Sequence, residues 1–125
     1  MIGSKVLLLE KGECILSLKV EKHHLNPMGL LHGGVLMTMA DTAAGCACSY
    51  EPVICPTVEG KLSFLAAGRL GDTIRVVGRE IRHGGTLMFC EVNIYNQNDI
   101  KLAAGLFTYM KSRMPLPEIP EKTYQ

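Results

Sequence analysis

The sequence predicts an α+β protein in which a curved antiparallel sheet wraps around one long, buried helix. The first observation is a segment of about 17 residues, from Gly33 to about Ser49, in which nearly every side chain is apolar or small. The second is that the segments on either side of it alternate apolar and polar residues, which is typical of half-buried strands. One helix with strands before and after it in sequence favours a sheet that curves around the helix.

Two strands are expected before the helix. Residues 6–9 form a short apolar run, and the polar residues 10–13 suggest a turn after it. In the next strand, 16–21, the apolar side chains share one face and the polar side chains share the other. His23 and His24 follow at the end of this strand, where we expect them to be solvated.

The helix is expected to begin at Gly33-Gly34 and to end near Ser49. Seventeen residues make a helix of ~25 Å, about the length of a small sheet. Apolar residues cover all of its faces, which predicts that the helix is buried on all sides. Asp41 is the only ionised residue within it, so the pattern places a carboxylate in the interior.

Four strands are expected after the helix, at 57–65, 73–82, 86–95 and 100–111. In the second of them the alternation loses its phase after Gly78. A β-bulge at this glycine would restore the phase. The short connections between these strands are rich in glycine and polar residues, as expected for turns in an antiparallel sheet.

The length of 125 residues predicts one domain, 1–125, with a proline-rich tail from about residue 114. Proline has no amide hydrogen to donate, so the tail cannot continue the sheet. The formal net charge is +1, and acidic and basic residues are mixed along the chain. This balance argues against nucleic acid as the main partner, because phosphate binding needs a basic stripe.

We expect a soluble, cytoplasmic protein. The N-terminal apolar run is too short for a signal sequence, and residues 35–50 fall short of the ~20 apolar residues of a membrane span. No metal site is expected, because the Cys-x-Cys spacing does not match the usual zinc pairs. The cysteines are interpreted as reduced thiols that serve as small hydrophobic residues; they are Cys14, Cys46, Cys48, Cys55 and Cys90.

Asp41 has two interpretations, because a buried ionised carboxylate is costly unless it is paired or hydrogen-bonded. In the structural interpretation, Asp41 lies at a subunit contact or binds a nearby backbone group. In the functional interpretation, it faces a substrate cleft and takes part in proton transfer.

The residues before Asp41 favour the functional interpretation. A helix N-terminus presents unpaired amide hydrogens, and Gly33 and Gly34 let a ligand approach them closely. Such amides can bind a carbonyl oxygen as negative charge develops on it. Asp41 follows Gly33 by eight residues, ~12 Å along the helix axis, so it cannot easily reach a group bound there. Two antiparallel copies of the helix in a two-fold dimer could bring the two together.

The pattern Asn26-x-x-Gly-x-x-His-Gly-Gly34, followed by Ala40-Asp41 and a helix of small residues, resembles the hotdog-fold acyl-CoA thioesterases of the PaaI (phenylacetic acid degradation) type. The resemblance covers most of the chain. It implies a hotdog fold and the hydrolysis of an aryl- or medium-chain acyl-CoA to free acid and coenzyme A. It also implies a homo-oligomer, either a dimer or a dimer of dimers. Coenzyme A enters as part of the substrate, with no separate cofactor and no membrane or nucleic-acid partner.

The same resemblance implies catalytic roles. The Gly33 amide, aided by Gly34, polarises the thioester carbonyl. Asp41 acts as general base or nucleophile on the carbonyl bound by the neighbouring subunit. Asn26 helps to hold the attacking water, and the Thr57 hydroxyl orients the acid or the water.

Two further features follow from the resemblance. His32 belongs to the motif and is expected to fix the loop rather than to act as a base. The turn after the second of the later strands resembles the region that contacts coenzyme A, although it can also be a plain hairpin turn. Its residues are Arg82, His83, Gly84, Gly85 and Thr86, and Arg82, His83 and Arg69 could pair with the coenzyme A phosphates.

Two other functions remain open at this point. A hotdog domain can bind acyl-CoA without turnover, as a sensor. A hotdog hydratase or dehydratase pairs an acid with a histidine, but here His32 precedes Asp41, the reverse of the hydratase order. The sequence also leaves three questions open. They are which acyl group is cleaved, whether the protein is a dimer or a tetramer, and whether Asp41 acts as a nucleophile or as a general base.

Overall fold

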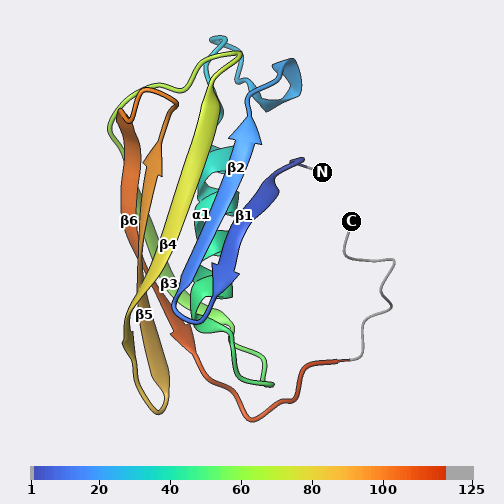
Figure 1. The fold of residues 1–125 in the computed structure, drawn as a ribbon, viewed down its shortest axis with the longest axis vertical. Helices are drawn as coiled ribbons and strands as arrows, with labels where there is room; N and C mark the ends of the chain where they lie inside the picture. The colour runs from blue at the N-terminus through green and yellow to red at the C-terminus, as the bar shows by residue number, and fades with distance from the viewer. Residues whose placement is uncertain (1, 118–125) are drawn as a thin grey trace.

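In the computed structural model, which describes residues 2–117, six strands form one antiparallel sheet and the long helix lies against its concave face (Figure 1). The strands are β1 (Lys5–Glu10), β2 (Glu13–Lys19), β3 (Thr57–Phe64), β4 (Thr73–His83), β5 (Leu87–Tyr95) and β6 (Lys101–Met110), and the helices are the 3₁₀ helix η1 (Lys22–His24) and α1 (Gly33–Cys48). The predicted fold class, a curved antiparallel sheet around one long helix, is confirmed.

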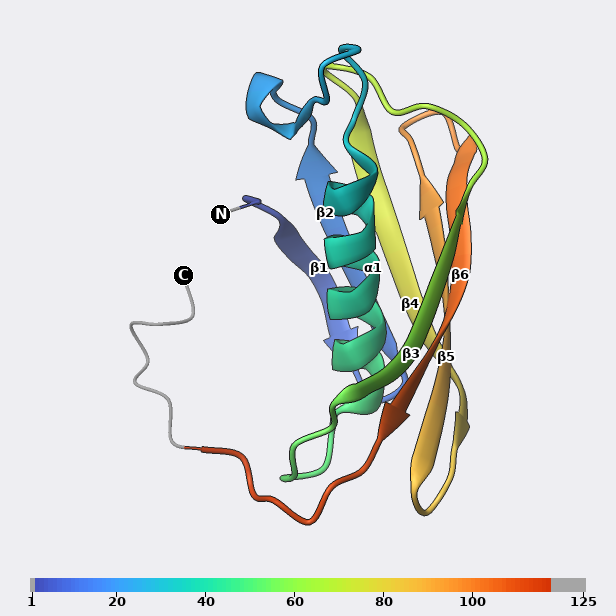
Figure 2. The same ribbon diagram turned by 180° about the vertical axis from the view of Figure 1, so that it is seen from behind.

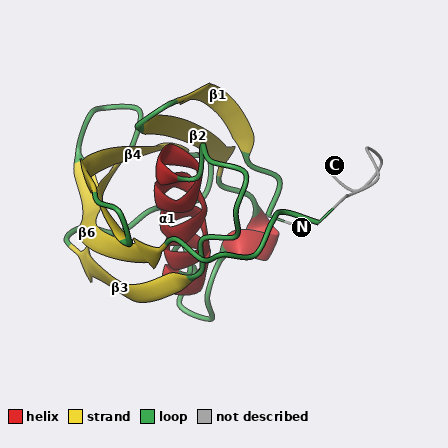
Figure 3. Ribbon diagram, turned by 90° about the horizontal axis from the view of Figure 1, so that it is seen from below, coloured by secondary structure: helices red, strands yellow, loops and turns green. Residues whose placement is uncertain are grey.

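The strands follow the order β1-β2-β4-β5-β6-β3, and every neighbouring pair is antiparallel. The chain leaves β2, forms α1 and then crosses to the far edge of the sheet as β3. Consequently β1 and β3 are the two edge strands, and α1 lies between them (Figure 2). Seen from below, the sheet curls around α1 (Figure 3).

The predicted bulge in β4 exists, but its predicted position at Gly78 is wrong. Gly78 pairs in regular register with both neighbouring strands, and the register shifts between Glu80 and Arg82 instead. Gly78 has a different structural role, because a Cβ at this position would lie only 2.7 Å from the carbonyl group of Ala43. The glycine therefore lets α1 approach the sheet closely.

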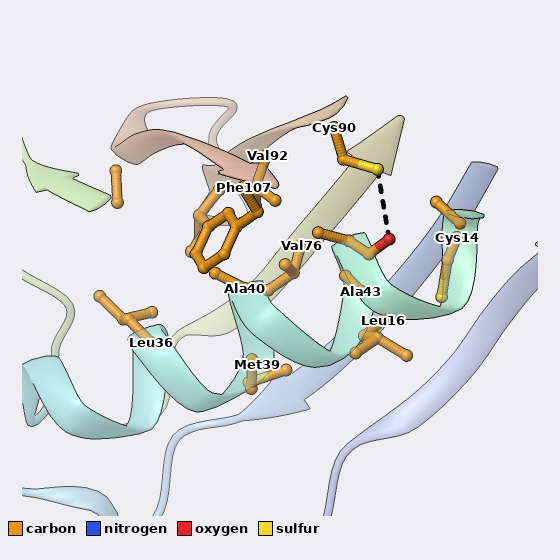
Figure 4. Close-up of a cluster of buried hydrophobic side chains, with 14 of the residues drawn as sticks. Cys14, Leu16, Leu36, Met39, Ala40, Ala43, Val76, Cys90, Val92 and Phe107 are labelled. Atoms are coloured by element: carbon orange, nitrogen blue, oxygen red, sulfur yellow. Dashed lines mark hydrogen bonds between the residues drawn. The ribbon is translucent and has the colours of Figure 1, made fainter. Parts of the chain in front are cut away.

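The core lies between α1 and the concave face of the sheet. The inward-facing residues of β5, Met88, Cys90, Val92 and Ile94, are fully buried, as the alternation predicts. The Cys90 thiol donates a hydrogen bond of 3.4 Å to the Ala44 carbonyl oxygen, and this bond joins the sheet to the helix (Figure 4). This packing fixes the rotation of α1 about its axis and so decides which of its side chains face away from the sheet.

The prediction that α1 is buried on all sides is wrong for the single chain. Gly34, Thr38, Thr42 and Cys46, four residues apart along the helix, are exposed, and Asp41 beside them is half-buried. The sheet leaves one side of α1 open between β1 and β3 (Figure 2), and the exposure of these residues indicates that they lie on that side. No helix in residues 2–117 is long and apolar enough to span a membrane.

His24 differs from the expectation that it is solvated: only 2% of it is exposed. Its Nε2 lies 2.7 Å from the Ile2 carbonyl oxygen, and its Nδ1 accepts a hydrogen bond from the Glu21 amide. At the other end of the chain, β6 ends at Met110, and Pro115 forms an isolated bridge with Val53. The rest of the proline-rich tail, from residue 118, lies outside the described residues.

Candidate active site

Asp41 lies in the middle of α1, and two hydroxyl groups from the sheet bind one of its carboxylate oxygens. The Tyr109 hydroxyl lies 2.6 Å from Oδ1 and the Thr57 hydroxyl lies 3.0 Å from it. The Tyr109 hydroxyl is also 2.8 Å from the Asp41 carbonyl oxygen. Within residues 2–117, no donor binds Oδ2, so one oxygen is fixed and the other is available for chemistry.

The packing of β6 against α1 brings Tyr109 to Asp41. Tyr109 points inward from β6 and is 2% exposed. Its ring passes Gly45, one turn after Asp41, where an added Cβ would make an ordinary van der Waals contact with the ring at 3.5 Å. Burial, together with the hydrogen bond to Asp41, raises the pKa of Tyr109 well above its ordinary value. The phenol therefore stays protonated and acts as a donor to Asp41.

The N-terminus of α1 presents a free amide. His32 is the N-cap residue: its Nδ1 accepts a hydrogen bond of 2.8 Å from the Gly34 amide, and its own amide donates to the His24 carbonyl oxygen. The Gly33 amide has no acceptor within the described part of the chain. Of the two glycines, Gly33 is thus the one whose amide can bind a ligand, and His32 fixes the loop.

A pocket of about 340 Å³ lies beside this helix start, and we call it the Gly33 pocket. It is lined by Asn26, Gly33, Phe64 and mostly aliphatic residues from 30–36 and 65–68. Asn26 shapes its wall, because its Oδ1 accepts hydrogen bonds from the amides of Met28 and Leu30. The Phe64 ring lies against Gly33, close enough that a Cβ there would be 3.2 Å from the ring tip.

A second pocket, of about 320 Å³, lies beside Asp41, and we call it the Asp41 pocket. It is lined by Leu9, Asp41, Thr42, Gly45, Cys46, Ser49, Thr57 and Tyr109. The two pockets share no residue. The structure therefore brings Thr57 to Asp41, and Asn26 and His32 to Gly33, but it does not bring Asp41 to Gly33 within one chain.

The turn at 82–86 connects β4 and β5, and both ring nitrogens of its histidine, His83, have carboxylate partners. Nδ1 of His83 lies 2.7 Å from Glu80 and Nε2 lies 2.7 Å from Glu51, while the ring stacks on Tyr50. The Glu80 carboxylate, followed by that of Glu51, raises the pKa of His83. Lys111 also binds Glu51 and, ahead of His83, lowers the pKa of that carboxyl group.

The other residues expected to contact coenzyme A are spread over this turn and one further loop. The Gly84 amide donates to the Leu87 carbonyl oxygen, and the Lys111 backbone amide donates to the Thr86 carbonyl oxygen. Gly85 and the side chains of Arg82 and Arg69 are exposed. Where the structure describes the chain, no group of three or more His, Cys, Asp or Glu side chains is arranged to hold a metal ion.

Sequence reasoning missed Tyr109. A signal for it is present, because Tyr109 falls on the same inward-facing side of β6 as Phe107. A buried phenol needs a hydrogen-bond partner, and Asp41 is the only ionised residue on the helix that the sheet surrounds.

Comparison with known proteins places this geometry in a family. The thioesterase superfamily model matches residues 28–103. Acyl-coenzyme A thioesterase 13 of Homo sapiens is 30% identical over 95 residues, which cover 74% of this chain and 68% of the relative. Acyl-coenzyme A thioesterase PaaI of Escherichia coli is 26% identical over 102 residues, which cover 82% of this chain and 73% of the relative.

Solved structures agree with the sequence matches. The E. coli PaaI structure superposes with a TM-score of 0.88 at 22% identity, over 93% of this chain and 84% of that one. The structure of smu.793 from Streptococcus mutans, bound to acetyl CoA, has a TM-score of 0.85 at 27% identity, over 91% of this chain and 92% of that one. The resemblance to the PaaI type is confirmed, and the chain belongs to the thioesterase superfamily with its hotdog fold.

Proposed function

We propose that the protein hydrolyses an acyl-CoA thioester to the free acid and coenzyme A, at a site completed by two copies of the chain. This proposal rests on the positions of two half-sites, the Asp41 pocket and the Gly33 pocket. They lie at opposite ends of β3. Thr57, its first residue, binds Asp41, and Phe64, its last residue, lies against Gly33.

The edge of β3 offers a way to join the half-sites. In a pair of β3 strands related by a two-fold axis, the strands run antiparallel, so the Thr57 end of one copy lies beside the Phe64 end of the other. The Asp41 pocket of one copy then adjoins the Gly33 pocket of its mate. The exposed apolar side chains of β3 support such pairing, since Val58 is 57% exposed and Phe64 is 56% exposed in the single chain.

The mechanism follows from the groups that are free. The Gly33 amide of one copy donates to the thioester oxygen and stabilises the negative charge that develops there. Oδ2 of Asp41 from the second copy removes a proton from water as the water attacks the carbonyl carbon, or attacks that carbon itself. When water attacks, the C–S bond breaks, the free acid forms, and coenzyme A leaves as a thiolate that takes up the proton from Asp41. When Asp41 attacks, the C–S bond breaks to leave a mixed anhydride, and water then hydrolyses this anhydride to the free acid and the Asp41 carboxylate, while the thiolate takes up the proton that the water releases.

Coenzyme A as the leaving group is supported by the comparisons. The similar S. mutans protein was crystallised with acetyl CoA, and both curated relatives described above are named acyl-coenzyme A thioesterases. We propose the exposed Arg82 and Arg69 as partners of the coenzyme A phosphates. The apolar Gly33 pocket suits an aryl or medium-chain acyl group, and the proposed reaction needs no metal or further cofactor and takes place in the cytosol.

The test is a free-thiol release assay over a panel of aryl- and alkyl-CoA thioesters. Asp41→Asn keeps the shape of the side chain and removes the base, so kcat should fall by at least about 100-fold. The matched control is Asp99→Asn, which makes the same chemical change on the β5–β6 turn, where Asp99 has φ 58 and Asn is well tolerated. The control should keep the wild-type rate.

Three results would contradict the proposal. Full activity in Asp41→Asn would remove the carboxylate from the mechanism. Binding of acyl-CoA without any thiol release would favour a sensor, and loss of enoyl-CoA absorbance without free thiol would favour a hydratase.

A further inference from the structure

His24 is a buried polar residue, and the site described above leaves it without a role. Asn96, which is also buried, serves its own turn, because its Oδ1 accepts hydrogen bonds from the amides of Asn98 and Ile100. His24 instead lies in η1, at the same end of the molecule as the start of α1 (Figure 2). Its hydrogen bonds extend beyond η1 in both directions along the chain. His24 therefore connects parts of the chain that are separate in sequence.

The two ring nitrogens of His24 bind groups whose hydrogen-bonding roles are fixed. Nδ1 lies 2.9 Å from the backbone amide of Glu21, which can only donate, and Nε2 lies 2.7 Å from the carbonyl oxygen of Ile2, which can only accept. The ring is therefore neutral and carries its hydrogen on Nε2. Only 2% of the residue is exposed, so water has little access to replace the ring as a partner of either group. The ring thus fastens the segment before β1 to the start of η1.

The backbone of His24 supports the start of α1. Its carbonyl oxygen accepts a hydrogen bond of 2.9 Å from the amide of His32, the N-cap residue. From this bond a short hairpin extends out and back, and we call it the 24–32 hairpin. Further along it, the Asn26 amide donates to the Leu30 carbonyl oxygen at 2.7 Å. His24 and His32 therefore form the base of the hairpin.

The 24–32 hairpin determines where the Gly33 amide points. The Gly33 nitrogen and the His32 carbonyl belong to one planar peptide unit, so a movement of the hairpin base turns the Gly33 N–H as well. A donor to a developing oxyanion is effective when its direction is fixed before the reaction. A second bond, of 2.9 Å from the Leu31 amide to the Gly68 carbonyl oxygen, holds the hairpin from the side. Loss of the His24 ring should therefore loosen the hairpin without detaching it.

We propose that His24 is a positioning residue for the Gly33 amide, and that its ring ties the segment at Ile2 to this half of the active site. His24 does not line the Gly33 pocket, so it acts through the backbone of the 24–32 hairpin rather than on the substrate. The effect on catalysis rests on the proposed thioesterase function, whereas the effect on the hairpin does not.

Hydrogen exchange of the full-length protein, followed by mass spectrometry, tests the structural part. His24→Phe keeps a ring of similar size and removes both of its hydrogen bonds. Peptides that cover the 24–32 hairpin should then exchange at least about tenfold faster, while peptides from β5 keep the wild-type rate and report an intact fold. His23→Phe is the matched control, because the His23 side chain is 59% exposed. It should exchange like the wild type.

A conservative variant should restore the hairpin in part. The side-chain amide of His24→Gln offers an acceptor for the Glu21 amide, as glutamine does in a capping box, and it has N–H donors for the Ile2 carbonyl oxygen. Its exchange rate should fall between those of the wild type and His24→Phe. His24→Met, with a flexible side chain, replaces His24→Phe if the planar ring prevents folding. Loss of the fold in both variants would overturn the inference, because His24 would then serve the fold as a whole.

Thiol release tests whether His24 acts through the Gly33 amide. His24→Phe should lower kcat at least about tenfold, because a misplacement of ~1 Å is costly in catalysis. In Gly33→Pro, which has no N–H at this position, the same change should lower kcat no further. A residue that serves only the stability of the fold would lower kcat by the same factor in both proteins.

Two further results would overturn the inference. One is unchanged exchange of the 24–32 hairpin in His24→Phe. The other is an equal loss of kcat with and without the Gly33 N–H. Failure of the proposed function looks different: the wild type would then release no thiol, while the hairpin of His24→Phe would still exchange faster.

Discussion

At the scale of single residues, Tyr109 and Thr57 fix the orientation of the Asp41 carboxylate. Both hydroxyls bind Oδ1, no donor among the described residues binds Oδ2, and Asp41 lines the Asp41 pocket. A hydrogen bond to a charged group contributes about 1.5–3 kcal/mol, which is enough to hold a short side chain in one rotamer. The geometry makes both residues positioning residues for the proposed base.

Tyr109→Phe removes one of these donors without changing the shape of the core. We expect kcat to fall about tenfold, which corresponds to about 1.4 kcal/mol, while KM changes little because Tyr109 does not hold the substrate. Tyr95→Phe is the matched control, since its ring contacts Arg75 and Lys101 through its face rather than through the hydroxyl. Steady-state kinetics of both variants checks this, and an equal loss in the two would contradict a special role for Tyr109.

Gly33→Pro tests the free amide directly. Proline is favoured at the first position of a helix, and His32 before it has ψ 131, which proline tolerates. The variant removes the N–H, so kcat should fall by about 100-fold. Gly33→Ala is the control: it adds a Cβ near the exposed Phe64 ring but keeps the N–H. A loss in the alanine variant as large as in the proline variant would assign the effect to the Cβ.

The sequence identifies only part of this residue-scale arrangement. Asp41 and the two glycines could be found because they are close in sequence and unusual in an apolar helix. The alternation in β6 indicates that Tyr109 points inward, but its pairing with Asp41 could not be predicted, because the two residues lie 68 positions apart and their contact depends on the register of β6. The exposure of Cys46 could not be predicted either, since it depends on which side of α1 the sheet leaves open.

At the scale of secondary-structure elements, the bulge in β4 has a consequence for charge. Residues three apart in a regular strand point to opposite faces. The extra residue between Glu80 and Arg82 restores a common face, so that Glu80 and His83 can bind each other. His83 then also binds Glu51, in the segment between α1 and β3, and Lys111 after β6 joins the same carboxylate. This network links the β4–β5 hairpin to the segment that leads to Thr57.

The network predicts how stability changes with pH. An imidazole that donates to two carboxylates must be protonated, and the raised pKa of His83 means that the folded state binds this proton more tightly. Its contribution is complete below the ordinary histidine value of 6.5 and is lost as pH rises through the folded-state pKa. Melting temperatures measured from pH 6 to 9 should fall more in the wild type than in His83→Gln.

His23→Gln serves as the control for this experiment, because the His23 side chain is 59% exposed. Its melting temperature should follow that of the wild type across the same range. A pH profile of His83→Gln that matches the wild type would show that the network does not control the change.

The periodicity of the sequence predicts the strands and the helix, but it does not predict where a β-bulge interrupts a strand. All six strands and the long helix were predictable, because apolar residues repeat with a period of two in the strands and fill the helix. The position of the bulge in β4 could not be predicted in this way. A lost phase shows only that one residue is extra, and Gly78, the obvious choice, is needed to let the helix approach.

At the scale of the whole molecule, the proposed active site requires two chains, and subunit mixing tests this. Asp41→Asn and Gly33→Pro should each be inactive alone. After unfolding and refolding together in equal amounts, half of the dimers are mixed, and each mixed dimer has one complete site out of two. About one quarter of the wild-type activity should therefore return, as measured by thiol release. No recovery, with mixed dimers confirmed by native mass spectrometry, would contradict a shared site.

The free edge of β3 also matters before two chains have met. Its backbone groups are unpaired on one side, and apolar side chains stand exposed along it. A newly made or highly diluted subunit would offer this edge to any extended segment nearby, which is the start of misassociation and aggregation. In the proposed dimer, rapid pairing of like chains would therefore protect the protein's solubility as well as its chemistry.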